Sequence, residues 1–142
     1  MSVTKSFHLF KILNHDKLIR CLETTKNGDI VTCGSEGQIT LWKFAKSPQS
    51  TNYEKITPFQ ESIHGKNLVF GIYRIKNNIF SEKECFATTS FDKTAKIWDL
   101  SGKVHLCLNG HAKSVNCFVE MEENFFVTGS FDQFFGNHLN QI

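Results

Sequence analysis

Short hydrophobic runs, separated by polar turns, recur along this chain of 142 residues. The runs are rich in β-branched and aromatic residues, and the clearest cover residues 19–22, 29–33, 38–44, 94–100, 115–118 and 125–129. Asn27-Gly28, Ser101-Gly102 and Asn109-Gly110 lie between runs and are typical turn pairs. No window of 12 or more residues has the period of an amphipathic helix. The pattern therefore predicts an all-β chain of short antiparallel strands.

The pattern is also repeated, because the same polar residues return at similar spacings. The sequence Ser-Phe-Asp occurs at residues 90–92 and again 40 residues later, at 130–132. A histidine stands 21 residues before the acidic position in the first and third copies, and 28 residues before it in the second. A fixed repeat of this length indicates one supersecondary unit that is copied along the chain.

The spacing divides the chain into three copies. Repeat 1 covers residues 14–58, repeat 2 covers 59–106, and an incomplete repeat 3 covers 107–133. After Gln133 the pattern is lost, because Phe134-Phe135-Gly136 follows where repeat 2 has Thr94-Ala95-Lys96. We expect residues 134–142 to be a divergent tail without the closing strand of a repeat.

Two segments resemble the ends of a WD repeat. Asn109-Gly110-His111 resembles its Gly-His opening, and residues 92–99 resemble its closing segment, with Trp98-Asp99 as the Trp-Asp pair. Repeats of that family fold into four-stranded antiparallel blades of a β-propeller. The resemblance covers roughly residues 7–133 and implies an incomplete WD-repeat β-propeller. By the same resemblance, residues 7–13 would be the outer strand of a last blade that this chain lacks.

In WD repeats a histidine, a hydroxyl, an aspartate and a tryptophan form a buried network within each blade. These residue types can satisfy one another, since aspartate accepts from histidine, histidine from a hydroxyl, and the hydroxyl from an indole N–H. The resemblance assigns to this network His15, Thr32, Glu36 and Trp42 in repeat 1, His64, Thr88, Asp92 and Trp98 in repeat 2, and His111, Thr128 and Asp132 in repeat 3. Ser90 lies on the same strand face as Thr88 and is the alternative hydroxyl. Glu36 stands where the family has aspartate and is one methylene longer.

A collection of serine, histidine and aspartate also raises the alternative of a hydrolase. No Gly-x-Ser-x-Gly elbow surrounds Ser90, and the same residue types recur in two copies, which a single active site would not require. We therefore predict a structural network, no catalytic residues and no enzyme activity.

Phe91 and Phe131 are candidates for partner binding, because each immediately precedes the turn aspartate, a position that often faces the top surface in WD repeats. The alternative is that both rings pack against a neighbouring blade. Lys17, Lys66 and Lys113 each lie two residues after a repeat histidine and could form a basic rim for an acidic partner. The alternative for them is three solvated loop lysines.

Composition narrows the class of protein further. The net charge of +2 and the scattered lysines and arginines do not favour a nucleic-acid surface, and no stretch of 18 apolar residues could cross a membrane. The five cysteines have no zinc-ligand spacing, so we predict neither metal nor cofactor. Their odd number, without a signal-peptide core, favours the cytoplasm, with the nucleus as the alternative. Cys21 and Cys117 share a repeat position and are expected to be small buried residues.

These observations predict a non-enzymatic scaffold for protein or peptide partners. The alternative is a regulatory propeller subunit that recognises ubiquitin or a modified tail in a degradation or signalling complex. A closed propeller needs about 4 to 8 blades, so we expect a fragment or truncated gene model, a splice product, or a subunit that closes by oligomerising. Open blade edges would favour self-association.

Overall fold

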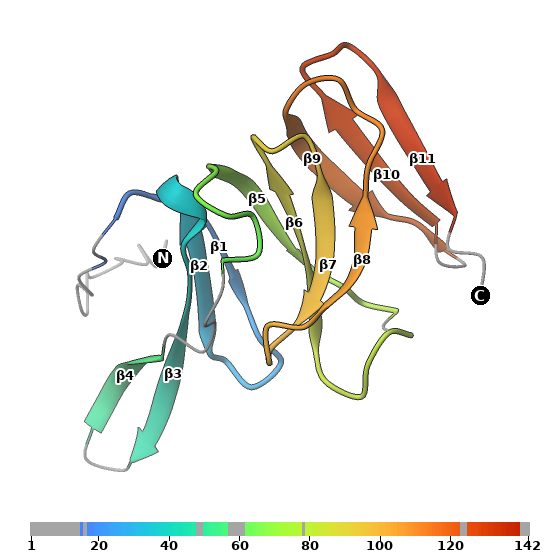
Figure 1. The fold of residues 1–142 in the computed structure, drawn as a ribbon. Helices are drawn as coiled ribbons and strands as arrows, with labels where there is room; N and C mark the ends of the chain where they lie inside the picture. Colours follow the sequence, from blue (N-terminus) through green and yellow to red (C-terminus); the bar gives the residue numbers. More distant parts are fainter. Residues whose placement is uncertain are drawn as a thin grey trace, which may run out of the picture.

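The computed structural model describes residues 15, 17–47, 50–56, 62–77, 79–122 and 125–139. Within them the chain forms three antiparallel sheets and one short 3-10 turn at Ser35–Gly37 (Figure 1). The predicted all-β class is confirmed. The predicted outer strand at residues 7–13 lies outside the described residues.

Each sheet is a meander in which consecutive strands are neighbours. The first sheet consists of β1 (Ile19–Thr24), β2 (Ile30–Gly34), β3 (Ile39–Ser47) and β4 (Ser50–Ile56). The second consists of β5 (Val69–Arg74), β6 (Cys85–Ser90), β7 (Ala95–Asp99) and β8 (Val104–Leu108). The third consists of β9 (Val115–Glu120), β10 (Phe125–Ser130) and β11 (Phe135–Leu139). Short consecutive strands that are joined by tight turns pair with their neighbours and so form this topology.

Strand β11 corrects the prediction that residues 134–142 are a divergent tail. It pairs with β10 in unbroken antiparallel register, so that Thr128 lies opposite Gly136, as Thr88 lies opposite Lys96 in the second sheet. The closing strand was overlooked because its side chains depart from those of repeat 2, whereas ladder pairing uses the backbone. Repeat 3 therefore contributes three strands rather than two.

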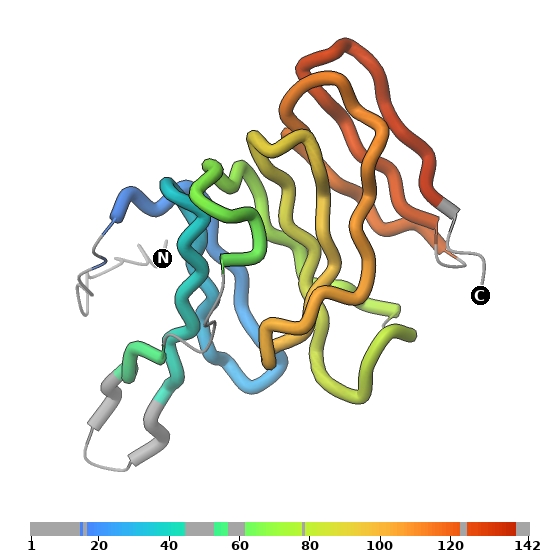
Figure 2. The backbone as a smooth tube through the Cα atoms, viewed as in Figure 1, coloured from blue at the N-terminus to red at the C-terminus, as the bar shows by residue number. Residues whose placement is uncertain are grey.

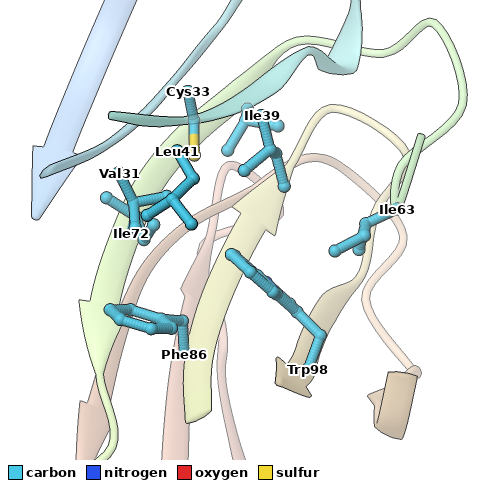
Figure 3. Packing of buried hydrophobic residues seen from close by; sticks show 9 residues of the cluster. Val31, Cys33, Ile39, Leu41, Ile63, Ile72, Phe86 and Trp98 are labelled. Carbon is cyan, nitrogen blue, oxygen red and sulfur yellow. The ribbon is translucent and has the colours of Figure 1, made fainter. Parts of the chain in front are cut away.

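The sheets lie face to face, and two hydrophobic clusters fill the spaces between them. Between the first and second sheets, Phe86 stacks on Trp98 at 5.4 Å between ring centroids, and both rings are fully buried. Figure 3 shows these rings below Val31, Leu41 and Ile72. Between the second and third sheets, Phe118 stacks on Phe126 at 5.6 Å. Such burial is the main favourable term for folding.

The hairpin turns define two different ends of the sheets. Turns 35–38, 91–94 and 131–134 lie at one end, together with the loops before β1, β5 and β9 (Figure 2). We call this end the turn face. At the opposite end two carboxylates join neighbouring sheets: Glu84 accepts the backbone N–H of Lys26, and Glu120 accepts those of Lys76 and Asn77. These contacts join the first sheet to the second and the second sheet to the third.

The described sheets form an open fan rather than a closed ring. On the outer face of the third sheet, Val119, Phe125 and Phe135 are exposed. The equivalent face of the second sheet, which includes Ala87 and Ala95, is buried against the third sheet. Cys117 is exposed on the same outer face, contrary to the expected burial. The third sheet thus has one packed face and one open face among the described residues.

Candidate functional site

The second sheet contains one continuous hydrogen-bonded network. The indole N–H of Trp98 donates to Thr88 Oγ1 at 3.1 Å, and Thr88 Oγ1 lies 2.8 Å from His64 Nε2. His64 Nδ1 lies 2.8 Å from Asp92 Oδ2. One proton arrangement satisfies every member: Thr88 donates to His64, and His64 donates to Asp92. Because Trp98, Thr88 and His64 are buried, this satisfaction removes the cost of burying them.

Asp92 anchors the hairpin turn at the end of this network. Besides His64, its carboxylate accepts the backbone N–H of Thr94 at 3.0 Å and the Thr94 hydroxyl at 2.6 Å. Lys96 Nζ lies 3.5 Å from it. Partial burial opposes ionisation, but the hydrogen bonds from His64 and Thr94 outweigh it and lower the pKa of Asp92 to about 2. The turn is therefore held by a charged group at neutral pH.

The third sheet builds the same network with a different last member. His111 Nδ1 lies 3.0 Å from Asp132 Oδ2, and His111 Nε2 lies 2.9 Å from Thr128 Oγ1. In place of an indole, His138 Nε2 lies 2.9 Å from Thr128 Oγ1. Burial, and then the nearby His111, lower the pKa of His138. Sequence reasoning missed His138, although it stands six residues after Asp132, as Trp98 stands six after Asp92.

The first sheet forms only part of the expected network. The Trp42 indole donates to Thr32 Oγ1 at 2.9 Å. His15 Nδ1 faces the carbonyl of Lys17 at 2.7 Å, and its Nε2 is buried without a partner in the described part of the chain. Glu36 does not reach His15, which corrects the predicted assignment. Its longer side chain extends outward to Lys17 Nζ, 2.9 Å away.

Ser90 and Thr88 have separate roles. The Ser90 hydroxyl donates to the Leu68 carbonyl at 2.9 Å and accepts the N–H of Asp92 at 3.2 Å. Ser130 likewise accepts the N–H of Asp132, but its hydroxyl donates to the carbonyl of Lys113, one residue before the equivalent of Leu68. The structure therefore brings Thr88, not Ser90, to the histidine. Among the described residues, Ser90 has no histidine base beside it as a hydrolase nucleophile would need.

Phe91 and Phe131 are exposed on the turn face, by 60% and 58% respectively. Their backbones are fixed, since the N–H of each donates to a carbonyl before the first strand of its sheet, Leu68 at 2.9 Å and Ser114 at 3.1 Å. The next residue in each turn is an aspartate held by its histidine. Each ring is thus presented to solvent from a rigid turn.

A row of side chains joins the three sheets beside these rings. Phe131 meets Phe70 edge-on at 6.1 Å, and the Arg20 guanidinium lies 5.8 Å from the centre of the Phe70 ring. Sequence reasoning did not select Arg20 or Phe70. The repeat register was the available signal, since each follows the first residue of the inner strand of its sheet.

The three predicted rim lysines are not equivalent. Lys17 and Lys113 each stand one residue before the carbonyl that receives the turn N–H, whereas Lys66 stands two residues before it. The loop after His64 therefore contains one extra residue. Lys66 and Lys113 are exposed, while Lys17 is paired with Glu36. The predicted arc of three matching lysines needs this correction, although all three lie on the turn face.

The described residues contain no group of three or more histidine, cysteine, aspartate or glutamate side chains placed to hold a metal ion. A cavity of about 480 Å³ lies beside His111, Asp132 and His138. Asp132 Oδ2 is already bonded to His111, and His138 Nε2 is already bonded to Thr128. No helix in the described part of the chain is long and apolar enough to cross a membrane.

Comparison with known proteins decides the family. The family model for the WD domain, G-beta repeat (WD40), matches residues 7–43 and 63–99, together more than half of the chain. This chain belongs to the WD-repeat family. The predicted resemblance is thereby confirmed, and WD40 domains are generally non-enzymatic scaffolds that bind proteins.

Individual relatives match only small parts of longer proteins. Mitochondrial division protein 1 of Schizosaccharomyces pombe is 47% identical over 47 residues, which are 32% of this chain and 7% of that protein. UDP-galactose:fucoside alpha-3-galactosyltransferase of Dictyostelium discoideum is 26% identical over 137 residues, 90% of this chain and 21% of that protein. The chain therefore spans well under two thirds of the curated relatives that it matches.

Among solved structures, the computationally designed Ika8 protein superposes with a TM-score of 0.61 at 18% identity. The match covers 87% of this chain and 33% of the designed protein. At that identity the likeness supports the fold alone.

Proposed function

We propose that this chain is a protein-interaction scaffold whose turn face binds a peptide segment of its partner. The observation that carries the proposal is the exposure of Phe91 and Phe131 at the same repeat position. An aromatic ring on a rigid backbone loses little conformational freedom on binding, which makes it an effective interface anchor. Membership of a family of scaffolds supports the same role.

The charges around these rings indicate the chemistry of the partner. Exposed cations of the turn face include Arg20, Lys66, Lys93 and Lys113. Glu36 is an exposed carboxylate there, and it is neutralised by Lys17. Asp92 and Asp132 are largely covered and hydrogen-bonded to histidines. A segment with an apolar anchor flanked by acidic residues would complement this surface.

We propose no transferase activity for this chain. The galactosyltransferase relative is matched over 21% of its length, so most of that enzyme has no counterpart here. Within the sheets, the histidine and aspartate side chains of the two complete networks are bonded to each other. They serve the hairpin turns rather than a substrate.

A display library of random peptides, selected on the purified chain, tests this function. Peptides with an aromatic or aliphatic residue beside acidic residues should be enriched, and Phe91→Ala with Phe131→Ala should weaken their binding at least tenfold. Val104→Ala is the matched control, because Val104 is an exposed apolar residue at the opposite end of the second sheet. Selected peptides that bind the double variant and the parent chain equally would place binding elsewhere.

A further inference from the structure

Two cysteines lie opposite each other on adjacent strands of the first sheet. The other two sheets have different residues at this position. Cys21 on β1 lies directly opposite Cys33 on β2. The equivalent pairs are Gly71 with Thr89 and Cys117 with Gly129. In each of those pairs one residue is glycine, and a neighbouring side chain occupies the space that a Cβ would need. A Cβ added at Gly129 would lie 2.6 Å from Cys117 Sγ. The first sheet is thus the one of the three in which two side chains share this tight position.

The Cys21 thiol lies close to the backbone of Cys33. Its Sγ is 3.9 Å from the Cys33 carbonyl oxygen, and both thiols are free. Residues directly opposite in antiparallel strands have Cβ atoms about 4.5–5.5 Å apart, and a disulfide needs about 3.5–4.5 Å. The β-bulge between Ile19 and Cys21 interrupts the ladder beside the pair. A small shift of β1 would bring the sulfurs to bonding distance.

The environments of the two thiols differ. Cys21 is half-buried and follows Arg20, whereas Cys33 is fully buried in the hydrophobic cluster. The hydrogen bond with Cys33 lowers the pKa of Cys21, burial raises it, and Arg20 lowers it, with a net decrease. Burial raises the pKa of Cys33. Cys21 is therefore the accessible and more acidic thiol, and Cys33 is the protected one.

We propose that Cys21 and Cys33 form a reversible disulfide within the first sheet when the protein meets hydrogen peroxide. The Cys21 thiolate attacks a peroxide oxygen, the O–O bond breaks, and hydroxide leaves with Cys21 as a sulfenic acid. The Cys33 sulfur then attacks the Cys21 sulfur, the S–O bond breaks, and water leaves. Two thiols are oxidised and one peroxide is reduced to two waters. The high pKa of Cys33 slows this second step, and its contact with Cys21 favours it.

The link would affect the turn face. Strand β2 leads directly into the turn that contains Glu36, the partner of Lys17. A covalent bond between β1 and β2 would hold this turn against the loop before β1. Oxidation would therefore change the mobility of one end of the turn face without adding a group to its surface.

Peptide mapping under non-reducing conditions tests the proposal. Tryptic cleavage after Arg20, Lys26 and Lys43 puts Cys21 in peptide 21–26 and Cys33 in peptide 27–43, and the other three cysteines fall in separate peptides. Hydrogen peroxide should produce a 21–26 to 27–43 link that a reductant removes. Cys117→Ser, a matched control at the equivalent position, should form the link to the same extent, whereas Cys21→Ser should not.

Two outcomes would overturn the proposal. In one, Cys107 and Cys117 are oxidised while peptides 21–26 and 27–43 stay unlinked. In the other, Cys21 accumulates as sulfinic acid or joins a different cysteine at a higher yield than Cys33.

Discussion

The second and third sheets build one network in two ways. In the second, Trp98 supplies both an N–H donor for Thr88 and a large ring that stacks on Phe86. In the third, His138 stands at the position of Trp98 and contacts Thr128. The hydrogen-bonding role of the closing residue can therefore be separated from its packing role. The network needs only a donor at this position, whereas the space between two sheets needs a large ring.

The same comparison explains why the two sheets should respond differently to change. The second sheet is packed on both faces, and its network is closed by a group that does not titrate. The third sheet is packed on one face within the described residues, and its network is closed by a histidine with a lowered pKa. Four tests probe this difference, and we order them from the largest expected effect to the smallest.

Removing the closing residue should give the largest difference in stability between the two sheets. Trp98→Ala should lower the free energy of unfolding by about 3–5 kcal/mol, because it empties a fully buried site and leaves Thr88 without its donor. His138→Ala should cost only about 1 kcal/mol, the usual worth of one hydrogen bond. Urea unfolding followed by far-UV circular dichroism measures both. Equal costs would show that packing does not distinguish the two positions.

Removing the central hydroxyl tests the network itself. Thr88→Val keeps the side-chain shape but removes the hydroxyl that bonds His64 Nε2 and the Trp98 N–H, so it should cost about 2–3 kcal/mol. Thr128→Val should cost about 1 kcal/mol, because His111 and His138 are less buried and can bind water instead. Ser90→Ala is the control for a hydroxyl outside the network. The comparison fails if Ser90→Ala is as costly as Thr88→Val.

The histidine in the third sheet should make that sheet sensitive to pH. The pKa of His138 is lowered below its ordinary 6.5 in the folded chain. The unfolded chain then binds more protons as the pH falls from 6.5 toward the folded pKa, so folding is weakened across that interval. Above pH 6.5 the contribution of His138 to folding stability is fully favourable.

Hydrogen exchange of residues 125–139, compared between pH 7.5 and 5.5, detects this effect against residues 85–99 of the second sheet. His138→Trp should remove the dependence, because an indole is not protonated in this range. An unchanged pH dependence in that variant would assign the effect to another group.

The smallest effect on stability is expected at the exposed rings. Phe91→Ala should change the free energy of unfolding by less than about 0.5 kcal/mol, because the ring is mostly in solvent and its turn is held by the backbone and Asp92. Thermal unfolding measures this. A melting temperature lower by several degrees would mean that Phe91 packs against the sheet and is no free anchor.

How much of the site could be predicted depends on the residue. Thr88 and Trp98 followed from the repeat, because their network uses residues at fixed spacings within one sheet. His138 could not be predicted from the repeat, because histidine stands where repeat 2 has tryptophan and the donor role that the two residues share is not visible in the sequence. Arg20 and Phe70 could not be predicted either, because their row crosses three sheets, and such contacts depend on how the sheets pack.

Repeat spacing, turn residues and alternation predicted the all-β class, and the resemblance to WD repeats implied the family and the residues of the second network. These are local properties, since strand pairing and hairpin networks join residues within one supersecondary unit. Only the tertiary structure showed that Glu36 turns away from His15, that β11 completes a ladder, and that Cys21 meets Cys33. These three findings depend on the length of a side chain, the register of a backbone or the absence of a Cβ. The strands packed around each position decide how much space is available there.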